Sequence, residues 1–144
     1  MATLRLEIAT AERLVYAEDV DVVVAPGIDG ELAVLPSHAP LLTELKPGEL
    51  RVVKGGEESL IALSGGFMEV MGDKVAILAD TAEHSDEIDL DRAEAALAQA
   101  RDEISSAQSS MDLERAMVSM RRSQARLRVA GRRRRDTGRA PPSA

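Results

Sequence analysis

Residues 74–97 read KVAILADTAEHSDEIDLDRAEAAL, and the spacing of the apolar side chains changes within this stretch. We interpret residues 74–78 as a strand with one buried face. From Leu90 onward apolar side chains recur every three or four positions, which is the period of an amphipathic helix. We therefore expect a strand-rich domain over residues 1–86 and a helical segment after it.

Short segments upstream of this change also alternate between apolar and polar residues, and turns that contain glycine or proline separate them. With no helical pattern between them, such segments are typical of an antiparallel β-sandwich or barrel. The predicted strands are 4–9, 20–25, 31–35, 49–53 and 74–78, and the predicted turns are 26–30, 46–48, 54–56, 65–66 and 72–73.

Residues 87–131 are expected to form an antiparallel hairpin of two helices joined by a short polar turn. Asp89 is a favourable N-cap for the first helix and Ser110 for the second, and Gly131 is a favourable stop. Alanine fills most of both apolar stripes, so the helices bury few large side chains and can leave a docked position at modest cost. The tail, residues 132–144, has the Arg-, Gly- and Pro-rich composition of a disordered segment.

The 144 residues include 25 acidic and 18 basic side chains, for a net charge of −7. Residues 1–86 contain 16 acidic and 6 basic residues, whereas residues 87–144 contain 9 acidic and 12 basic residues, so the two parts are expected to have different partners.

The absence of cysteine excludes disulfides and cysteine-bound zinc. No apolar run reaches the ~20 residues of a membrane-spanning helix, and the N-terminus lacks the pattern of a signal peptide, so any membrane association is expected to come through a partner.

Three stretches, in order along the chain, resemble the epsilon subunits of bacterial F-type ATP synthases. They are GIDGELAVLPSHAPLLTELKPGELRV at 27–52, SGGFMEVMGDKVAILADTAE at 64–83 and IDLDRAEAAL at 88–97. The resemblance spans residues 3–130 and implies a β-sandwich joined to a two-helix hairpin, the fold that the periodicity predicts on its own.

The resemblance implies a non-catalytic subunit of the rotor stalk, peripheral to the cytoplasmic face of the bacterial cell membrane. Its sandwich would lie between the gamma subunit and the c-ring. Its hairpin would either fold onto the sandwich or extend along gamma toward the alpha and beta subunits, where it would inhibit ATP hydrolysis. Asp29, Gly30, Glu31 and His38 would belong to the surface that faces the rotor. His38 has no second histidine or cysteine nearby in sequence, so no metal site is expected.

The segment Ile88–Ala93 resembles the Ile-Asp-x-x-Arg-Ala motif with which some bacterial members bind ATP, so the resemblance implies a regulatory ATP and no required cofactor. Two arginines four residues apart on the second helix share a face and, opposite Arg92, would form a cationic notch suited to phosphates. The sequence departs from the family at Gln99, where ATP-binding members carry arginine, so weaker binding is expected. The predicted ATP-binding residues are Glu83, Ile88, Asp89, Arg92, Ala93, Gln99, Arg122 and Arg126.

Simpler interpretations of the same residues stay open at this stage. Residues 27–31 are ordinary for a solvated hairpin turn, and Ile88–Ala93 is an ordinary helix start with an aspartate cap. The run Arg132–Arg135 is either a solvated tail or a contact for an acidic surface, and it suggests a nucleic-acid adaptor as the alternative function. The acidic chain and its two aromatic residues argue against an adaptor. No phosphate-binding loop or nucleophile motif indicates an enzyme.

Overall fold

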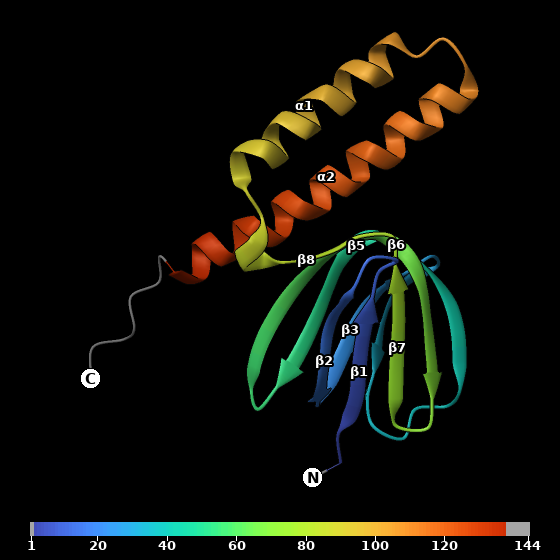
Figure 1. Cartoon of the computed structure of the whole chain (residues 1–144), viewed down its shortest axis with the longest axis vertical. Coiled ribbons are helices and arrows are strands. Elements are labelled where there is room, and N and C mark those ends of the chain that lie inside the picture. The colour runs from blue at the N-terminus through green and yellow to red at the C-terminus, as the bar shows by residue number, and fades with distance from the viewer. Residues whose placement is uncertain (1, 138–144) are drawn as a thin grey trace.

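The computed structural model describes residues 2–137, with side chains through residue 131. It consists of a β-sandwich and a two-helix hairpin that projects from one end of the sandwich (Figure 1). The strands are β1 (Leu4–Ala9), β2 (Leu14–Val20), β3 (Val22–Gly27), β4 (Gly30–Val34), β5 (Leu41–Lys54), β6 (Glu57–Met71), β7 (Lys74–Ala79) and β8 (Ala82–His84). The helices are the short 3-10 helix η1 (Ser85–Glu87), α1 (Leu90–Ser106) and α2 (Ser110–Thr137).

All the described strands belong to one continuous sheet, which folds over on itself into a sandwich (Figure 1). Its strand order is β2-β1-β7-β6-β5-β3-β4, and β8 pairs with β6 beside this path. β1 and β7 run parallel, whereas the other described pairs are antiparallel. The predicted β-sandwich followed by a helical hairpin is confirmed, and this parallel pair is the one departure from an antiparallel order.

Strands β5 and β6 are long because each passes through a bend where the sequence predicts a turn. The pairing of β5 with β6 continues on both sides of this bend. Gly66 has a φ of 143°, a conformation that glycine adopts without steric penalty. The predicted turns at 46–48 and 65–66 are therefore wrong, since these residues bend two strands that serve both layers of the sandwich.

The remaining sequence-based assignments within the sandwich agree with the structure. The five predicted strands are found in β1, β3, β4, β5 and β7, whereas β2, β6 and β8 are strands that the periodicity did not predict. The predicted turns at 26–30, 54–56 and 72–73 each contain the turn that joins two neighbouring strands.

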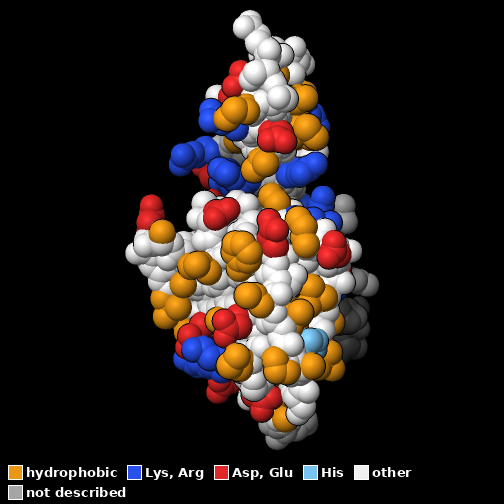
Figure 2. Space-filling view, turned by 90° about the vertical axis from the view of Figure 1, so that its right-hand side faces the viewer, with side chains coloured by type: hydrophobic (Ala, Val, Ile, Leu, Met, Phe, Trp, Pro, Cys, Tyr) orange, Lys and Arg blue, Asp and Glu red, His pale blue; other side chains and the backbone are white. Residues whose placement is uncertain are grey.

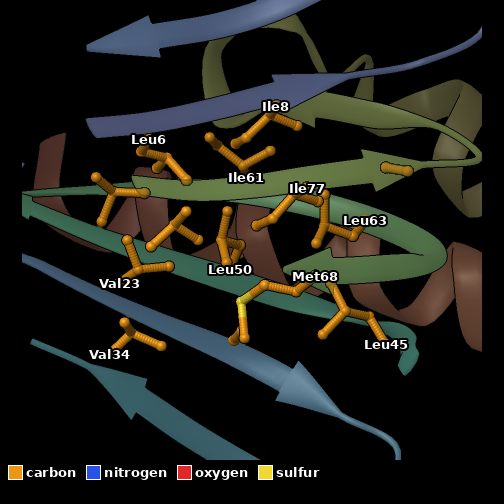
Figure 3. Close-up of a cluster of buried hydrophobic side chains, with 14 of the residues drawn as sticks. Leu6, Ile8, Val23, Val34, Leu45, Leu50, Ile61, Leu63, Met68 and Ile77 are labelled. Carbon is orange, nitrogen blue, oxygen red and sulfur yellow. The ribbon is translucent and has the colours of Figure 1, made fainter. Parts of the chain in front are cut away.

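The core of the sandwich lies between its two layers and comes from alternating strand positions (Figure 3). In β1, Leu4, Leu6 and Ile8 are fully buried, while the residues between them are more exposed. All the buried members of this core lie between residues 4 and 82, so the described part of the hairpin contributes none of them. Because each large apolar side chain contributes about 1.5–3 kcal/mol when buried, the sandwich has a core that does not depend on the helices.

Capping residues define where each helix of the hairpin begins. Asp89 caps α1 as predicted, since its Oδ1 accepts the Arg92 N–H at 3.2 Å. The second helix is capped by Ser109, whose Oγ accepts the Asp112 N–H at 3.1 Å. The prediction of Ser110 as this cap is wrong by one residue, because Ser110 is already the first residue of α2.

Helix α2 continues through Gly131 to Thr137. A single glycine costs a helix only about 1 kcal/mol relative to alanine, and the arginines that follow it are good helix formers. The predicted stop at Gly131 is therefore wrong, while the predicted disorder of the tail stays a prediction. Residues 138–144 of the predicted tail lie outside the described residues. Within the described part of the chain, no helix combines the length and the apolar character needed to cross a membrane.

The hairpin docks on the sandwich where α2 crosses β5 and β6 (Figure 1). A small apolar cluster, separate from the sandwich core, joins the two parts, and we call it the docking cluster. Half of its buried members are alanines, so its contribution to docking is limited to roughly a few kcal/mol. The buried members are Leu60 and Ala62 of β6, Ile88 of the linker, Ala93 of α1, and Val129 and Ala130 of α2.

Candidate functional sites

Four large apolar side chains from four strands lie exposed around one hollow of about 330 Å³ on the outside of the sandwich. Leu42 is 71% exposed and Phe67 is 55% exposed. Hydrophobic side chains gather over the sandwich in the view of Figure 2. Soluble proteins seldom expose such a group unless a partner covers it. We call this surface the apolar face; its members are Leu14, Leu42, Phe67 and Leu78.

Strand register explains why these side chains lie together. Phe67 lies opposite Leu78 in the β6–β7 pair. Their neighbours in sequence, Met68 and Ile77, are buried in the core. Since successive side chains of a strand point to opposite faces, Phe67 and Leu78 must point outward. The sheet therefore holds the apolar face on a rigid base.

The turn at residues 28–31 borders the apolar face. The N–H of Ile28 donates to the carbonyl of Glu44 at 3.0 Å. Glu44 in turn lies opposite Phe67 in the β5–β6 pair. Ile28 is itself about half exposed, so the turn presents an apolar side chain next to its acidic residues.

The structure divides the predicted rotor-facing residues between two places. Asp29, Gly30 and Glu31 lie together at the turn, and the carboxylate of Glu31 pairs with Arg51 at 3.0 Å. His38 lies beyond the other end of β4, and five residues of strand span about 13 Å. In the described part of the chain, no three His, Cys, Asp or Glu side chains gather into a group that could hold a metal ion.

Sequence reasoning missed the apolar face, although a weak signal for it exists. Three strands contain two consecutive apolar residues where strict alternation would place a polar one, at 41–42, 67–68 and 77–78. One member of each pair must face outward in a strand. Which member faces outward depends on register, so periodicity alone could not identify the exposed residues.

A second candidate site lies where the hairpin meets the sandwich. Glu83 of β8 and Arg126 of α2 form an ion pair, with Oε2 and Nε 2.7 Å apart and both side chains partly buried. Basic side chains gather at this level of the molecule in Figure 2. The structure thus brings together two of the predicted ATP-binding residues that are 43 positions apart in the chain.

Two further residues of the predicted ATP set, Ile88 and Ala93, meet in the docking cluster. Ala93 is fully buried there, so a purine ring could lie beside it only if the cluster opened. Asp89 holds the first turn of α1 as its cap. These three residues therefore have structural roles in the docked hairpin.

The remaining residues of the predicted ATP set are exposed and have separate surroundings. Arg92 lies on the first turn of α1. The amide of Gln99 donates to the carboxylate of Glu103 on the same helix at 3.2 Å. Arg122 lines a hollow along α2. The assignment of all eight residues to one nucleotide site stays a prediction. The other residues of the Arg122 hollow are Met111, Glu114, Arg115 and Val118.

The linker strand β8 is anchored on β2 through an aromatic contact. The rings of His84 and Tyr16 have centroids 5.8 Å apart. Burial raises the pKa of Tyr16 to about 12, and its hydrogen bond to Glu18 adds to this shift. The same hydrogen bond lowers the pKa of Glu18, and Lys54 at 3.4 Å contributes. Near neutral pH Tyr16 is protonated and Glu18 is ionised, which suits a fixed anchor better than a proton-transferring pair.

Two family models cover the sandwich and the hairpin in turn. Residues 3–85 match the beta-sandwich domain of the ATP synthase delta/epsilon chain. Residues 86–131 match the long alpha-helix domain of the same chain. The chain belongs to the delta/epsilon chain family of ATP synthase.

Curated relatives narrow this family to one kind of subunit. The ATP synthase epsilon chain of Herpetosiphon aurantiacus is 53% identical over 131 residues, which cover 91% of this chain and 96% of the relative. The epsilon chain of Desulforamulus reducens is 48% identical over 128 residues, covering 89% and 97%. These relatives place the chain among the epsilon subunits, which belong to the central stalk of F-type ATP synthases.

Solved structures show the same architecture. The chain is similar to one in the mitochondrial ATP synthase of Euglena gracilis, determined with its c-ring, with a TM-score of 0.77 and 26% identity over 90% of this chain and 82% of that chain. A chain from the central stalk and c-ring of Tetrahymena thermophila ATP synthase shares the fold, with a TM-score of 0.59 and 15% identity over 90% and 95%. These comparisons give the nucleic-acid alternative no support.

Proposed function

We propose that the chain fastens the rotor of ATP synthase, binding the gamma subunit with its apolar face and the c-ring with the adjoining turn at 28–31. The exposed apolar face carries this proposal, because four large apolar side chains gathered on one rigid sheet surface are suited to burial against another protein. In this account the chain performs no chemistry, and catalysis belongs to other subunits. Its partners hold it peripherally at the cytoplasmic face of the bacterial cell membrane.

The hairpin is the regulatory part of the proposal. Its docking rests on the alanine-rich docking cluster and on the partly exposed ion pair of Glu83 with Arg126. Partly exposed ion pairs contribute little to the stability of the docked form. Undocking should therefore cost only roughly a few kcal/mol. A released hairpin would extend along gamma toward the alpha and beta subunits and obstruct rotation in the direction of hydrolysis.

Removal of residues 88–144 should leave a subunit that assembles and supports ATP synthesis, while ATP hydrolysis by the complex increases several-fold. Assembly should survive because the sandwich core and the apolar face lie wholly outside the deleted residues. Hydrolysis rates of complexes reconstituted with the full-length and truncated chains, at low ATP, measure the effect. Equal rates would contradict the inhibitory role of the hairpin and leave the role of the apolar face standing.

We further propose that ATP binds at the junction of hairpin and sandwich through its phosphates, with the docking cluster closed, and so favours the docked form. Arg126 is already present there, and Arg122 lies one turn before it on the same face of α2. A ligand at about 100 times its dissociation constant stabilises the form that it binds by ~2.7 kcal/mol. Burying one or two leucines has a similar effect, so bound ATP is sufficient to set the hairpin equilibrium.

Replacing Gln99 with arginine should tighten ATP binding by up to about tenfold, or ~1.4 kcal/mol. Position 99 lies seven residues after Arg92, nearly in register with it around the helix. An arginine there can form a charge-assisted hydrogen bond to phosphate, which is stronger than the neutral bond of glutamine. Because Glu103 already binds residue 99, we expect the full effect in Gln99→Arg combined with Glu103→Gln. Calorimetric titration with ATP measures it.

Two alanine variants accompany this titration. Arg126→Ala should weaken ATP binding at least about tenfold, since it removes a charge from the phosphate site. Arg101→Ala removes an exposed charge on another face of α1 and should have little effect. If neither Arg126→Ala nor the Gln99 double variant differs from the wild type, ATP does not bind at this junction. The Ile88–Ala93 segment is then only a helix start.

A further inference from the structure

The loop between β4 and β5 has a strained residue at its centre. Ser37 has a φ of 66°, and it is the one non-glycine residue of the described chain with a positive value. A residue with a side chain is disfavoured in this left-handed conformation, so surrounding contacts must hold it. Asp73 provides such a contact, since its Oδ1 accepts the Ser37 N–H at 3.0 Å from 36 positions away.

Asp73 is itself held in a fixed place at the turn between β6 and β7. Gly72 before it has a φ of 60°, which shapes the turn. The carbonyl of Asp73 accepts the N–H of Arg5, the second residue of β1, at 2.7 Å. The backbone of Asp73 is therefore tied to the sheet while its side chain holds the loop. A loop restrained in this way loses less conformational entropy when it binds a partner.

The restrained loop, residues 35–40, borders the apolar face. It leads directly into β5, where Leu42 is a strongly exposed member of that face. Leu35, at the start of the loop, is also more than half exposed. Met71 is exposed two residues before Asp73, at the end of the strand that carries Phe67. A protein that covers the apolar face would therefore extend onto this loop.

We propose that Asp73 is a positioning residue for rotor attachment, holding the loop at 35–40 in the shape that the gamma subunit recognises. This inference rests on the proposed attachment through the apolar face. Asp73 acts through the Ser37 N–H and needs no contact of its own with the partner. The turn between β6 and β7 and the loop at 35–40 thus form one preorganised edge of the binding surface.

Replacing Asp73 with alanine should weaken binding of the full-length chain to purified gamma subunit by about tenfold, because the loop loses its restraint. Asp73→Asn should bind like the wild type, since its amide oxygen can still accept the Ser37 N–H. Ser37→Pro removes the same N–H and fixes φ near −65°. It should weaken binding as Asp73→Ala does, although it leaves the β6–β7 turn intact. Calorimetry measures affinity, and the melting temperature of each variant reports its folding.

Asp21→Ala is the matched control. The carboxylate of Asp21 likewise accepts a distant turn N–H, that of Gly55 at 2.9 Å, but this turn does not line the apolar face. The control should bind gamma like the wild type. The inference is overturned if Asp73→Ala and Ser37→Pro bind as tightly as the wild type, or if Asp73→Asn binds as weakly as Asp73→Ala. Failure of the wild-type chain to bind gamma would instead contradict the proposed function.

Discussion

Replacing Leu42 with aspartate should weaken binding of the chain to the gamma subunit by at least about a hundredfold, or ~2.7 kcal/mol. The change removes an apolar contact from the middle of the proposed interface and places an unpaired charge there. Leu42 is 71% exposed in the free chain. The free energy of unfolding should therefore stay within about 0.5 kcal/mol of the wild-type value. Titration with purified gamma subunit measures the affinity, and chemical denaturation measures the stability.

Ser59→Asp is the control for the added charge. Ser59 is an exposed residue of β6 that lines a different hollow of the sandwich. Its replacement adds the same negative charge outside the apolar face, so binding to gamma should be unchanged. If Leu42→Asp binds gamma as tightly as Ser59→Asp does, the apolar face is not the attachment surface.

Replacing Gly66 with alanine should lower the free energy of unfolding by more than about 4 kcal/mol, a loss that few single substitutions reach. Gly66 lies at the bend of β6 with a φ of 143°, and a Cβ there would overlap the carbonyl oxygen of Leu78. The backbone of β7 cannot move aside freely, because it is paired with β6 on one side and β1 on the other. Urea denaturation followed by circular dichroism measures the loss.

Gly72→Ala separates backbone strain from steric overlap. Gly72 also has a positive φ, of 60°, but a Cβ at this position would meet open space. Its replacement should lower the free energy of unfolding by only about 1–2 kcal/mol, the cost of the left-handed conformation. Similar losses for Gly66→Ala and Gly72→Ala would show that packing at the bend is looser than this account requires.

The division into sandwich and hairpin could be predicted from the sequence because it depends on neighbours close along the chain. Alternation over residues 4–9 reflects one strand with a single buried face. The spacing after Leu90 reflects one helix, and Asp89 caps that helix through a bond to the residue three positions later. Each of these signals is complete within a few residues, so no tertiary information is needed to interpret it.

The bends and the helix end could not be predicted in this way. Gly65 and Gly66 form as good a turn signal as Gly55 and Gly56, yet only the second pair ends a strand. The difference lies in strand pairing, which continues past the first pair and not past the second. Gly131 is likewise a favourable stop, but its cost of about 1 kcal/mol is too small to end a long helix.

The candidate sites also depend on contacts between residues that are distant in the sequence. The assignment of the turn at 28–31 to the rotor-facing surface rests on one continuous stretch of sequence and stays a prediction, whereas the apolar face is assembled from four strands by their register. At the hairpin junction the structure pairs Glu83 with Arg126. Along α1, the amide of Gln99 donates a hydrogen bond to the carboxylate of Glu103, a contact that was not predicted from the sequence.

In the assembled enzyme, a partner should cover the apolar face. The chain contains no cysteine, so Leu42→Cys introduces a single thiol on that face and Glu57→Cys introduces one on an exposed residue away from it. The decisive measurement is the rate of maleimide labelling of each variant, free and within assembled ATP synthase. Labelling of Leu42→Cys should be fast in the free chain and at least about tenfold slower after assembly, because the thiol is no longer accessible. Labelling of Glu57→Cys should not change. Equal labelling of Leu42→Cys in the two states would show that no partner covers the apolar face.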